Sequence, residues 1–390
     1  MMREAPQRTT SDTRLHSLDF VRGVAAMAVI FWHWQHFFLT QPGELKDRSI
    51  EPFYAVLQPL YDYGWIAVDI FFCLSGFVFF WLYAQSIADG RMGARRFSVL
   101  RFSRLYPLHI ATLLYMAVAQ AMMKAATGAY FVYPVNDMAH FVRNIFFVQA
   151  WGIDMPESFN GPAWSVSVEI LLYASFFLVA RARMAERTPL LLAIAAVGAL
   201  CLFLLDRQIG RGILEFYLGG VTYRAWARWA PHISLRAASA LLTAMLGLLL
   251  AELVILRFDL VHQAMGALAP SMPMLARLEK LVDPAFLFGL RLFQIPLTVF
   301  AFAAHELSSR TRFYDRPARL GDITYASYLL HVPMQISFAL AVAYGLFPAG
   351  WLQSGLLLPI FFALLIGLSV VVYLKFELPA QRWLRNRLSH

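Results

Sequence analysis

The sequence contains few charged residues and almost no cysteine. Only 15% of its 390 residues are charged and 59% are hydrophobic, whereas about a quarter of a typical soluble chain is charged. Apolar runs occupy nearly the whole length and leave no room for a separate soluble domain. The two cysteines, Cys73 and Cys201, both lie inside apolar runs, which excludes a disulfide framework and a cysteine zinc site. We therefore predict an all-α integral membrane protein with a single domain.

Acidic residues are also scarce, with 24 Asp and Glu against 33 Lys and Arg, which gives a formal net charge of +9. Such an excess is typical of proteins that bind nucleic acid, but here the arginines concentrate between the apolar runs. The positive-inside rule places such loops in the cytoplasm, beside anionic lipid. We predict contact with membrane lipid and none with nucleic acid.

About ten apolar segments are long enough to cross a bilayer, because roughly 20 residues span the hydrocarbon core. The predicted transmembrane helices cover residues 18–38, 61–87, 106–127, 162–180, 189–205, 211–227, 237–256, 284–304, 321–346 and 352–374. With this count, every strongly arginine-rich loop lies on the same side of the membrane.

The same topology places both chain ends in the cytoplasm. Residues 1–17 form an arginine-containing N-terminal tail, residues 18–383 the single multi-spanning domain, and residues 384–390 a C-terminal tail. The segment 128–160 is outside, and its apolar middle is too short to span, so we predict an interfacial or re-entrant helix there. The loop 257–283 fits this topology least well, because it carries three basic residues.

The first span has ionisable groups near both ends, Arg22 at one and His33 at the other. Such groups usually face a protein interior or a wet cavity. On an α-helix the two residues project from one face, about 16 Å apart, which suggests a site that runs through the bilayer. The alternative is that Arg22 reaches the headgroups and His33 is a hydrogen-bonded core residue. His33 and His36 have no obvious third ligand, so no metal site is predicted.

Other spans also contain ionisable groups. Asp69 is either the partner of a buried cation such as Arg22 or a catalytic group. Glu169 and Ser165 are four residues apart and share a helical face; the carboxylate either orients a catalytic histidine or pairs with an arginine. Glu215 and His331 are expected to be structural or to line a cavity.

Two arginines, Arg101 and Arg104, stand one helical turn apart where the third span begins, in RFSRLYP. They are either ordinary positive-inside charge or a phosphate-binding pair, because guanidinium forks suit several phosphates at once.

The order of these motifs resembles that of membrane-bound acyltransferase family 3, whose multi-spanning members acylate sugars outside the cytoplasm. The resemblance extends from Leu18 to Trp383. The stretches that carry it are LDFVRGVAAMAVIFWHW, GWIAVDIFFCLSGF, RFSRLYPLHI, NGPAWSVSVEILLY, RGILEFYLGG, LGDITYASYLLHVP and FELPAQRW.

The resemblance implies acyl transfer from a cytoplasmic acyl-coenzyme A, most commonly acetyl-coenzyme A (acetyl-CoA). His33 matches the family's essential histidine and Arg22 its paired arginine. Arg101 and Arg104 match its Arg-x-x-Arg pair, and Glu169 its Trp-Ser-x-Ser-Val-Glu glutamate. Cys73 stands where an aliphatic residue is more usual, and no second acid follows Glu169.

We therefore predict that the arginines hold the phosphates of coenzyme A and that His33 is the general base. Glu169 or Asp69 would fix the tautomer of its imidazole. The residues expected to contact the acceptor are Asn160, Trp164, Ser165 and His331.

The expected acceptor is a sugar hydroxyl of a bacterial surface polysaccharide or a lipid-linked glycan, and the expected location is the cytoplasmic (inner) membrane of a bacterium. Direct transfer and an acyl-enzyme on His33 or Ser75 both remain open. A transporter or flippase of a lipid-linked glycan, which needs no coenzyme A, is the alternative function. The sequence predicts no oligomeric state.

Overall fold

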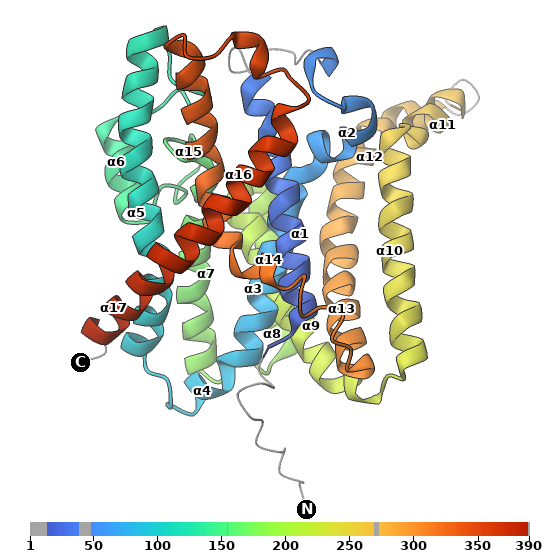
Figure 1. Ribbon diagram of the computed structural model, residues 1–390. Coiled ribbons are helices and arrows are strands. Elements are labelled where there is room, and N and C mark those ends of the chain that lie inside the picture. The colour runs from blue at the N-terminus through green and yellow to red at the C-terminus, as the bar shows by residue number, and fades with distance from the viewer. Residues whose placement is uncertain (1–13, 39–47, 154, 269–272, 389–390) are drawn as a thin grey trace, which may run out of the picture.

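The computed structural model describes residues 14–38, 48–153, 155–268 and 273–388, with no side chains described for 273–280. Every regular element in this part of the chain is a helix (Figure 1). The prediction of an all-helical, multi-pass membrane protein is confirmed.

Each predicted span coincides with a helix or with consecutive helices. In chain order these are α1 (His16–Trp32) with the 3₁₀ segment η2 (His33–Phe38), α2 (Tyr54–Tyr63) leading to α3 (Ala67–Leu82), α5 (Ala94–Thr127), α7 (Trp164–Arg181), α8 (Thr188–Leu204), α9 (Arg207–Trp229), α10 (Leu235–Arg257), α12 (Pro273–Gly289) leading to α13 (Ile295–Ser309), α15 (Thr324–Ala343), and α16 (Leu357–Val372) leading to α17 (Leu378–Leu388).

Among the described residues, seven helices are long and apolar enough to cross a membrane, and α8 is a shorter apolar helix. The other two predicted spans correspond to α1 and α9. Helix α1 has only 17 residues before it tightens into η2. Helix α9 carries Arg211 and Glu215 in its first half, which lowers its hydropathy.

The arginine-rich connections gather at one end of the bundle, which we call the arginine-rich end (Figure 1). It includes α4 (Ala84–Ala88), the start of α5 and the turn between α9 and α10. Helix α2 and α11 (Leu260–Leu268) lie at the opposite end. One arginine-rich end is what the positive-inside rule requires; the cytoplasmic location of both termini stays a prediction. In the segment 128–160, α6 (Met138–Ile145) has only eight residues, too few to span.

Helix α1 lies inside the bundle, and Ala26, Val29 and Ile30 are fully buried. Its free N-terminal amides are satisfied by another span: the backbone N–H groups of His16 and Ser17 donate to the carboxylate of Glu306 in α13 (3.0 and 2.8 Å). An acid at a helix N-terminus is also favoured by the helix dipole. The start of α1 is thereby fixed, which sets the depth of the side chains that it carries.

Helices α3 and α9 pack backbone to backbone through small residues. A Cβ atom at Gly76 would lie 1.9 Å from the carbonyl oxygen of Phe216, and one at Gly219 would lie 2.0 Å from that of Cys73. Only glycine permits this approach, as at many helix crossings in membranes. The crossing presents the neighbouring Ser75 to a cavity between α3, α5 and α7.

Candidate active site

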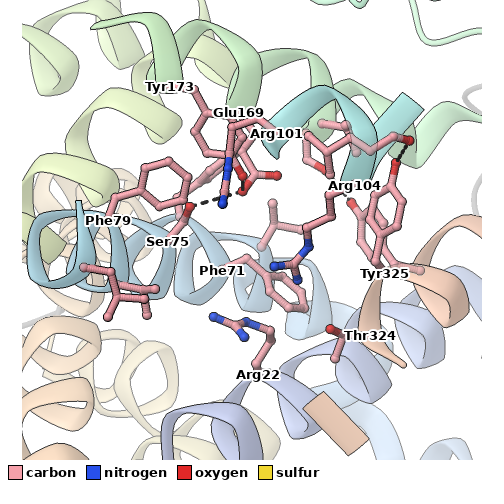
Figure 2. Close-up of a pocket in the computed structure, with 18 of the residues that line it drawn as sticks. Arg22, Phe71, Ser75, Phe79, Arg101, Arg104, Glu169, Tyr173, Thr324 and Tyr325 are labelled. Carbon is pink, nitrogen blue, oxygen red and sulfur yellow. Dashed lines mark hydrogen bonds between the residues drawn. The ribbon is translucent and has the colours of Figure 1, made fainter. Parts of the chain in front are cut away.

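A cavity of about 210 Å³ opens near the arginine-rich end and is lined by side chains of α1, α3, α5, α7 and α15. We call it the inner cavity. Figure 2 shows Arg22, Arg101 and Arg104 converging on one space, with Glu169 and Ser75 beside them. The three arginines that the sequence assigns to coenzyme A phosphates therefore line one site, although they come from two helices far apart in sequence.

Arg101 is held rigidly by aromatic rings. Its guanidinium carbon lies 5.0 Å from the centroid of Phe79 and 4.9 Å from that of Tyr83, and its Nη2 donates to the Tyr83 hydroxyl (2.8 Å). Such cation–π contacts orient a guanidinium; the Nε of Arg101 is buried and has no hydrogen-bond partner among the described residues.

The side chains of Arg104 and Arg22 make fewer contacts with the protein than that of Arg101. Arg22 donates from Nη1 to Asp19 (2.8 Å), whereas Arg104 makes no hydrogen bond or ion pair with any described residue. Buried or cavity-facing guanidiniums normally have anionic partners. The inner cavity therefore has the cationic surplus that an anion such as a phosphate would neutralise.

Glu169 is the carboxylate of this inner cavity. Its Oε1 accepts from Ser75 Oγ (3.1 Å) and from the hydroxyl of Tyr173 one turn later. Ser165 lines the same cavity, as its four-residue spacing from Glu169 predicts. The carboxylate lines the same cavity as the three arginines, but its hydrogen bonds are with Ser75 and Tyr173 and it forms no ion pair with an arginine among the described residues.

A second cavity, of about 550 Å³, lies towards the opposite end of the bundle; we call it the outer cavity. His33, Trp164 and Trp65 line it, together with Arg211 and Arg291. Arg22 therefore lines the inner cavity and His33 the outer one. Val68 and Tyr328 line both cavities and form the boundary between them.

His33 has a defined tautomer. Its Nδ1 lies 2.9 Å from the backbone oxygen of Val29, and because a carbonyl only accepts, Nδ1 carries the proton and Nε2 is left as the acceptor. His33 is 5% exposed, and its ring packs against those of His36 and His331, with distances of 4.9 and 4.8 Å between ring centroids. A neutral imidazole with a free Nε2 is the form that a general base needs.

Asp69 is the partner of buried cations, one of the two roles that the sequence left open, but these cations are not Arg22. It does not contact His33 either, which corrects the expectation that it fixes the tautomer of the imidazole. Its Oδ1 accepts from Arg211 Nε (2.8 Å) and its Oδ2 from Arg291 Nε (3.1 Å), and the side chain is fully buried. Glu169 does not contact His33 either, so the tautomer is set by Val29 rather than by a carboxylate.

The family model for the acyltransferase domain of acyltransferase family 3 matches residues 15–374. This chain belongs to that family. "Protein 2 in picA locus" of Rhizobium radiobacter is 28% identical over 201 residues, which is 46% of this chain and 90% of the relative. "Acyltransferase MdmB" of Streptomyces mycarofaciens is 31% identical over 169 residues, 42% of this chain and 38% of that relative. No solved structure matches.

As a membrane acyltransferase, the protein uses an acyl donor and an acceptor, and most residues predicted for them line the two cavities. Arg22, Arg101, Arg104, Ser165 and Glu169 lie in the inner one, and His33 and Trp164 in the outer one.

Two predicted acceptor contacts line neither cavity. Asn160 is buried and donates from Nδ2 to the carbonyl of Leu329 (2.9 Å), which ties the turn before α7 to α15. His331 is fully buried behind His33. Their positions indicate support of the site rather than contact with a substrate.

Several cavity residues were absent from the sequence prediction, notably Arg211, Arg291, Trp65 and Tyr328. Arg291 had a visible signal, since it is a charged residue inside the predicted span 284–304. Tyr328 and Trp65 had none, because aromatic residues are common in membrane helices.

Proposed function

We propose that the protein is a transmembrane O-acyltransferase that moves an acyl group, most often acetyl, from acyl-coenzyme A to a sugar hydroxyl of an extracytoplasmic or lipid-linked glycan. Membership of the family supports acyl transfer. The observation that carries the rest is the pair of adjoining cavities, one lined by three arginines and the other by His33.

Coenzyme A binds in this proposal with its phosphates on Arg22, Arg101 and Arg104, because guanidiniums form charge-assisted hydrogen bonds with phosphate oxygens. The arm of the donor passes the boundary formed by Val68 and Tyr328. Its thioester then reaches the outer cavity, where His33 lies.

His33 Nε2 takes the proton of the acceptor hydroxyl while that oxygen attacks the thioester carbonyl. The C–S bond breaks, an ester forms, and coenzyme A leaves as a thiolate that takes up the proton. Placing both reactants in adjoining cavities supplies proximity, so a base and a thioester suffice. An acyl-enzyme on Ser75 is less well supported, because its hydroxyl donates to Glu169 in the inner cavity rather than contacting a base in the outer one.

The test compares acetyl-CoA binding and acetyl transfer or thioester hydrolysis by the purified wild type and His33→Gln. We expect His33→Gln to bind acetyl-CoA normally and to lose turnover. His109→Gln is the matched control, because His109 is another buried histidine bonded to a backbone oxygen, that of Asn144, and lines neither cavity. A wild type without affinity for any acyl-coenzyme A would contradict the proposal and favour a transporter. An acetyl adduct on the protein, detected by intact mass, would replace direct transfer with an acyl-enzyme.

A further inference from the structure

Two buried arginines in the outer cavity share a single carboxylate. Arg211 and Arg291 each use Nε to contact one oxygen of Asp69. Two positive charges against one negative leave this part of the wall with a surplus of one positive charge. Asp69 is fully buried and the Arg291 side chain is only 8% exposed, so bulk water does little to screen the surplus.

Both guanidiniums have N–H groups that make no hydrogen bond with a described residue. Arg291 donates to described residues from Nε alone, and Arg211 from Nε and from Nη2, which bonds the carbonyl of Trp65 (3.2 Å). The remaining Nη groups have no partner among the described residues, and both side chains line the cavity. A charged donor without a protein partner in such a wall is costly unless water or a ligand completes it, and an anionic ligand would do so with its own charge.

The other charges of the cavity do not cancel this surplus. Asp283 is at the rim and 63% exposed, and Arg207 adds a further positive charge. Glu157 is half-buried, and burial raises its pKa to about 7 against the opposing effect of Arg211. Glu215 lies close enough to Asp69, Arg211 and Arg291 to interact with them electrostatically. It does not line the cavity, and both its carboxyl oxygens are buried without a hydrogen-bond partner among the described residues, an environment that disfavours an ionised carboxylate.

The same cavity has a rigid aromatic surface. The ring centroid of Trp65 lies 4.8 Å from the guanidinium carbon of Arg211 and 5.5 Å from that of Arg291. The ring centroid of Trp164 lies 5.4 Å from the guanidinium carbon of Arg211. The indoles hold the guanidiniums in place. Indole faces also offer the apolar surface onto which a sugar ring packs, while fixed polar groups set its orientation.

We propose that the outer cavity binds its acceptor through an oxyanion that Arg211 and Arg291 chelate together, so that the acceptor is an anionic glycan rather than a neutral one. This rests on the proposed function and specifies its acceptor. Carboxylates and phosphates both suit two guanidiniums. The anion is therefore either the carboxylate of an acidic sugar or the phosphate of a lipid carrier, and the site places it beside His33.

The experiment measures the dissociation constants of three probes for the purified protein in detergent: tetragalacturonate, undecaprenyl diphosphate and the neutral maltotetraose. We expect at least one anionic probe to bind at least tenfold more tightly than maltotetraose, and the one that does so identifies the source of the anion. Arg291→Gln should weaken that binding at least tenfold and leave maltotetraose unchanged. Arg257→Gln is the matched control: it removes the same charge from the same end of the bundle, where Arg257 contacts the carbonyl of Ala55 and lines neither cavity.

The proposal is overturned if neither anionic probe binds more tightly than maltotetraose, or if Arg291→Gln keeps the wild-type preference. Acetyl-CoA binding, measured on the same samples, shows whether Arg291→Gln is folded. If it is not folded, Arg291→Lys is used instead. It keeps a positive charge beside Asp69 but lacks the two-pronged guanidinium, and it should still weaken binding of the anionic probe. Failure of the transferase itself would be seen separately, as a wild type that does not bind acetyl-CoA.

Discussion

Removing the Arg104 guanidinium is expected to weaken binding of acetyl-CoA without destabilising the protein. Arg104 has no hydrogen bond or ion pair to lose among the described residues. It interacts with Glu169 and Glu377 only through space, so most of the effect should fall on the ligand. A hydrogen bond to a charged group contributes about 1.5–3 kcal/mol, and each 1.4 kcal/mol or so is a factor of ten. Arg104→Gln should thus weaken binding roughly 10- to 150-fold.

The assay compares two donors by calorimetric titration: acetyl-CoA and S-acetylpantetheine, which has the same thioester arm but no phosphate. Binding of S-acetylpantetheine should not change in Arg104→Gln. Arg95→Gln is the matched control, because Arg95 is exposed on the same helix and lines neither cavity. Arg101→Gln should differ from both, since it also loses the contacts with Phe79 and Tyr83 and should lower the melting temperature. Equal weakening of both donors by Arg104→Gln would refute the assignment of phosphates to the inner cavity.

Three further outcomes test the two-cavity arrangement. Asp69→Asn removes the carboxylate that pairs with two buried guanidiniums and should cost about 3–5 kcal/mol, seen as a lower melting temperature; an unchanged melting temperature would contradict a stabilising role of these ion pairs. Val68→Phe adds bulk at the boundary between the cavities and should reduce acetyl transfer while acetyl-CoA still binds; full activity would place the passage elsewhere. The pKa of Glu157 is raised by burial from 4.5 to about 7, so the folded state binds its proton more tightly than the unfolded state does. Its contribution to stability is complete below about pH 4.5 and is lost as the pH rises to 7; the melting temperature should fall over that window and fall less in Glu157→Gln.

The sequence predicted the helices well because membrane spans have a strong, local signal. Apolar runs of span length recur between arginine-rich loops, and each predicted span coincides with helical structure. The short helix in the segment 128–160 was also visible as an apolar stretch that could not reach across. The weakest predictions concern α1 and α9, where buried ionisable groups interrupt the apolar pattern.

The pairing of side chains between helices was much less predictable. Asp69 was expected to pair with a buried cation or to be catalytic, and the sequence did not show which cation, because a helix position gives only the depth and face of a side chain. Its actual partners come from α9 and from the segment before α13, more than 140 residues away. The tautomer of His33 was likewise attributed to a carboxylate, whereas a backbone oxygen four residues earlier suffices. A contact with Val29 in helix α1 therefore fixes the tautomer of His33, instead of the contact with a carboxylate on another helix that the motif suggested.

The arginine N–H groups that lack a hydrogen-bond partner among the described residues face the two cavities, which gives a reason why so many arginines lie inside a membrane protein. Asp69 is satisfied on both oxygens, whereas Arg104 and Arg291 have unused donors that face the inner and the outer cavity respectively. Unpaired charged groups are tolerated in low-dielectric surroundings only where water or a ligand reaches them. In the proposed mechanism each cavity is completed by an anion: the donor's phosphates in the inner one and the acceptor's oxyanion in the outer one. Val68 and Tyr328 line both cavities, and His33, the proposed base, lines the outer one. Ligands that bind only the folded state stabilise it, so acetyl-CoA should raise the melting temperature in wild type and Arg291→Gln but much less in Arg104→Gln. An anionic acceptor should raise the melting temperature of wild type and Arg104→Gln but much less that of Arg291→Gln. If both ligands depended on the same arginine, the two cavities would be one binding site.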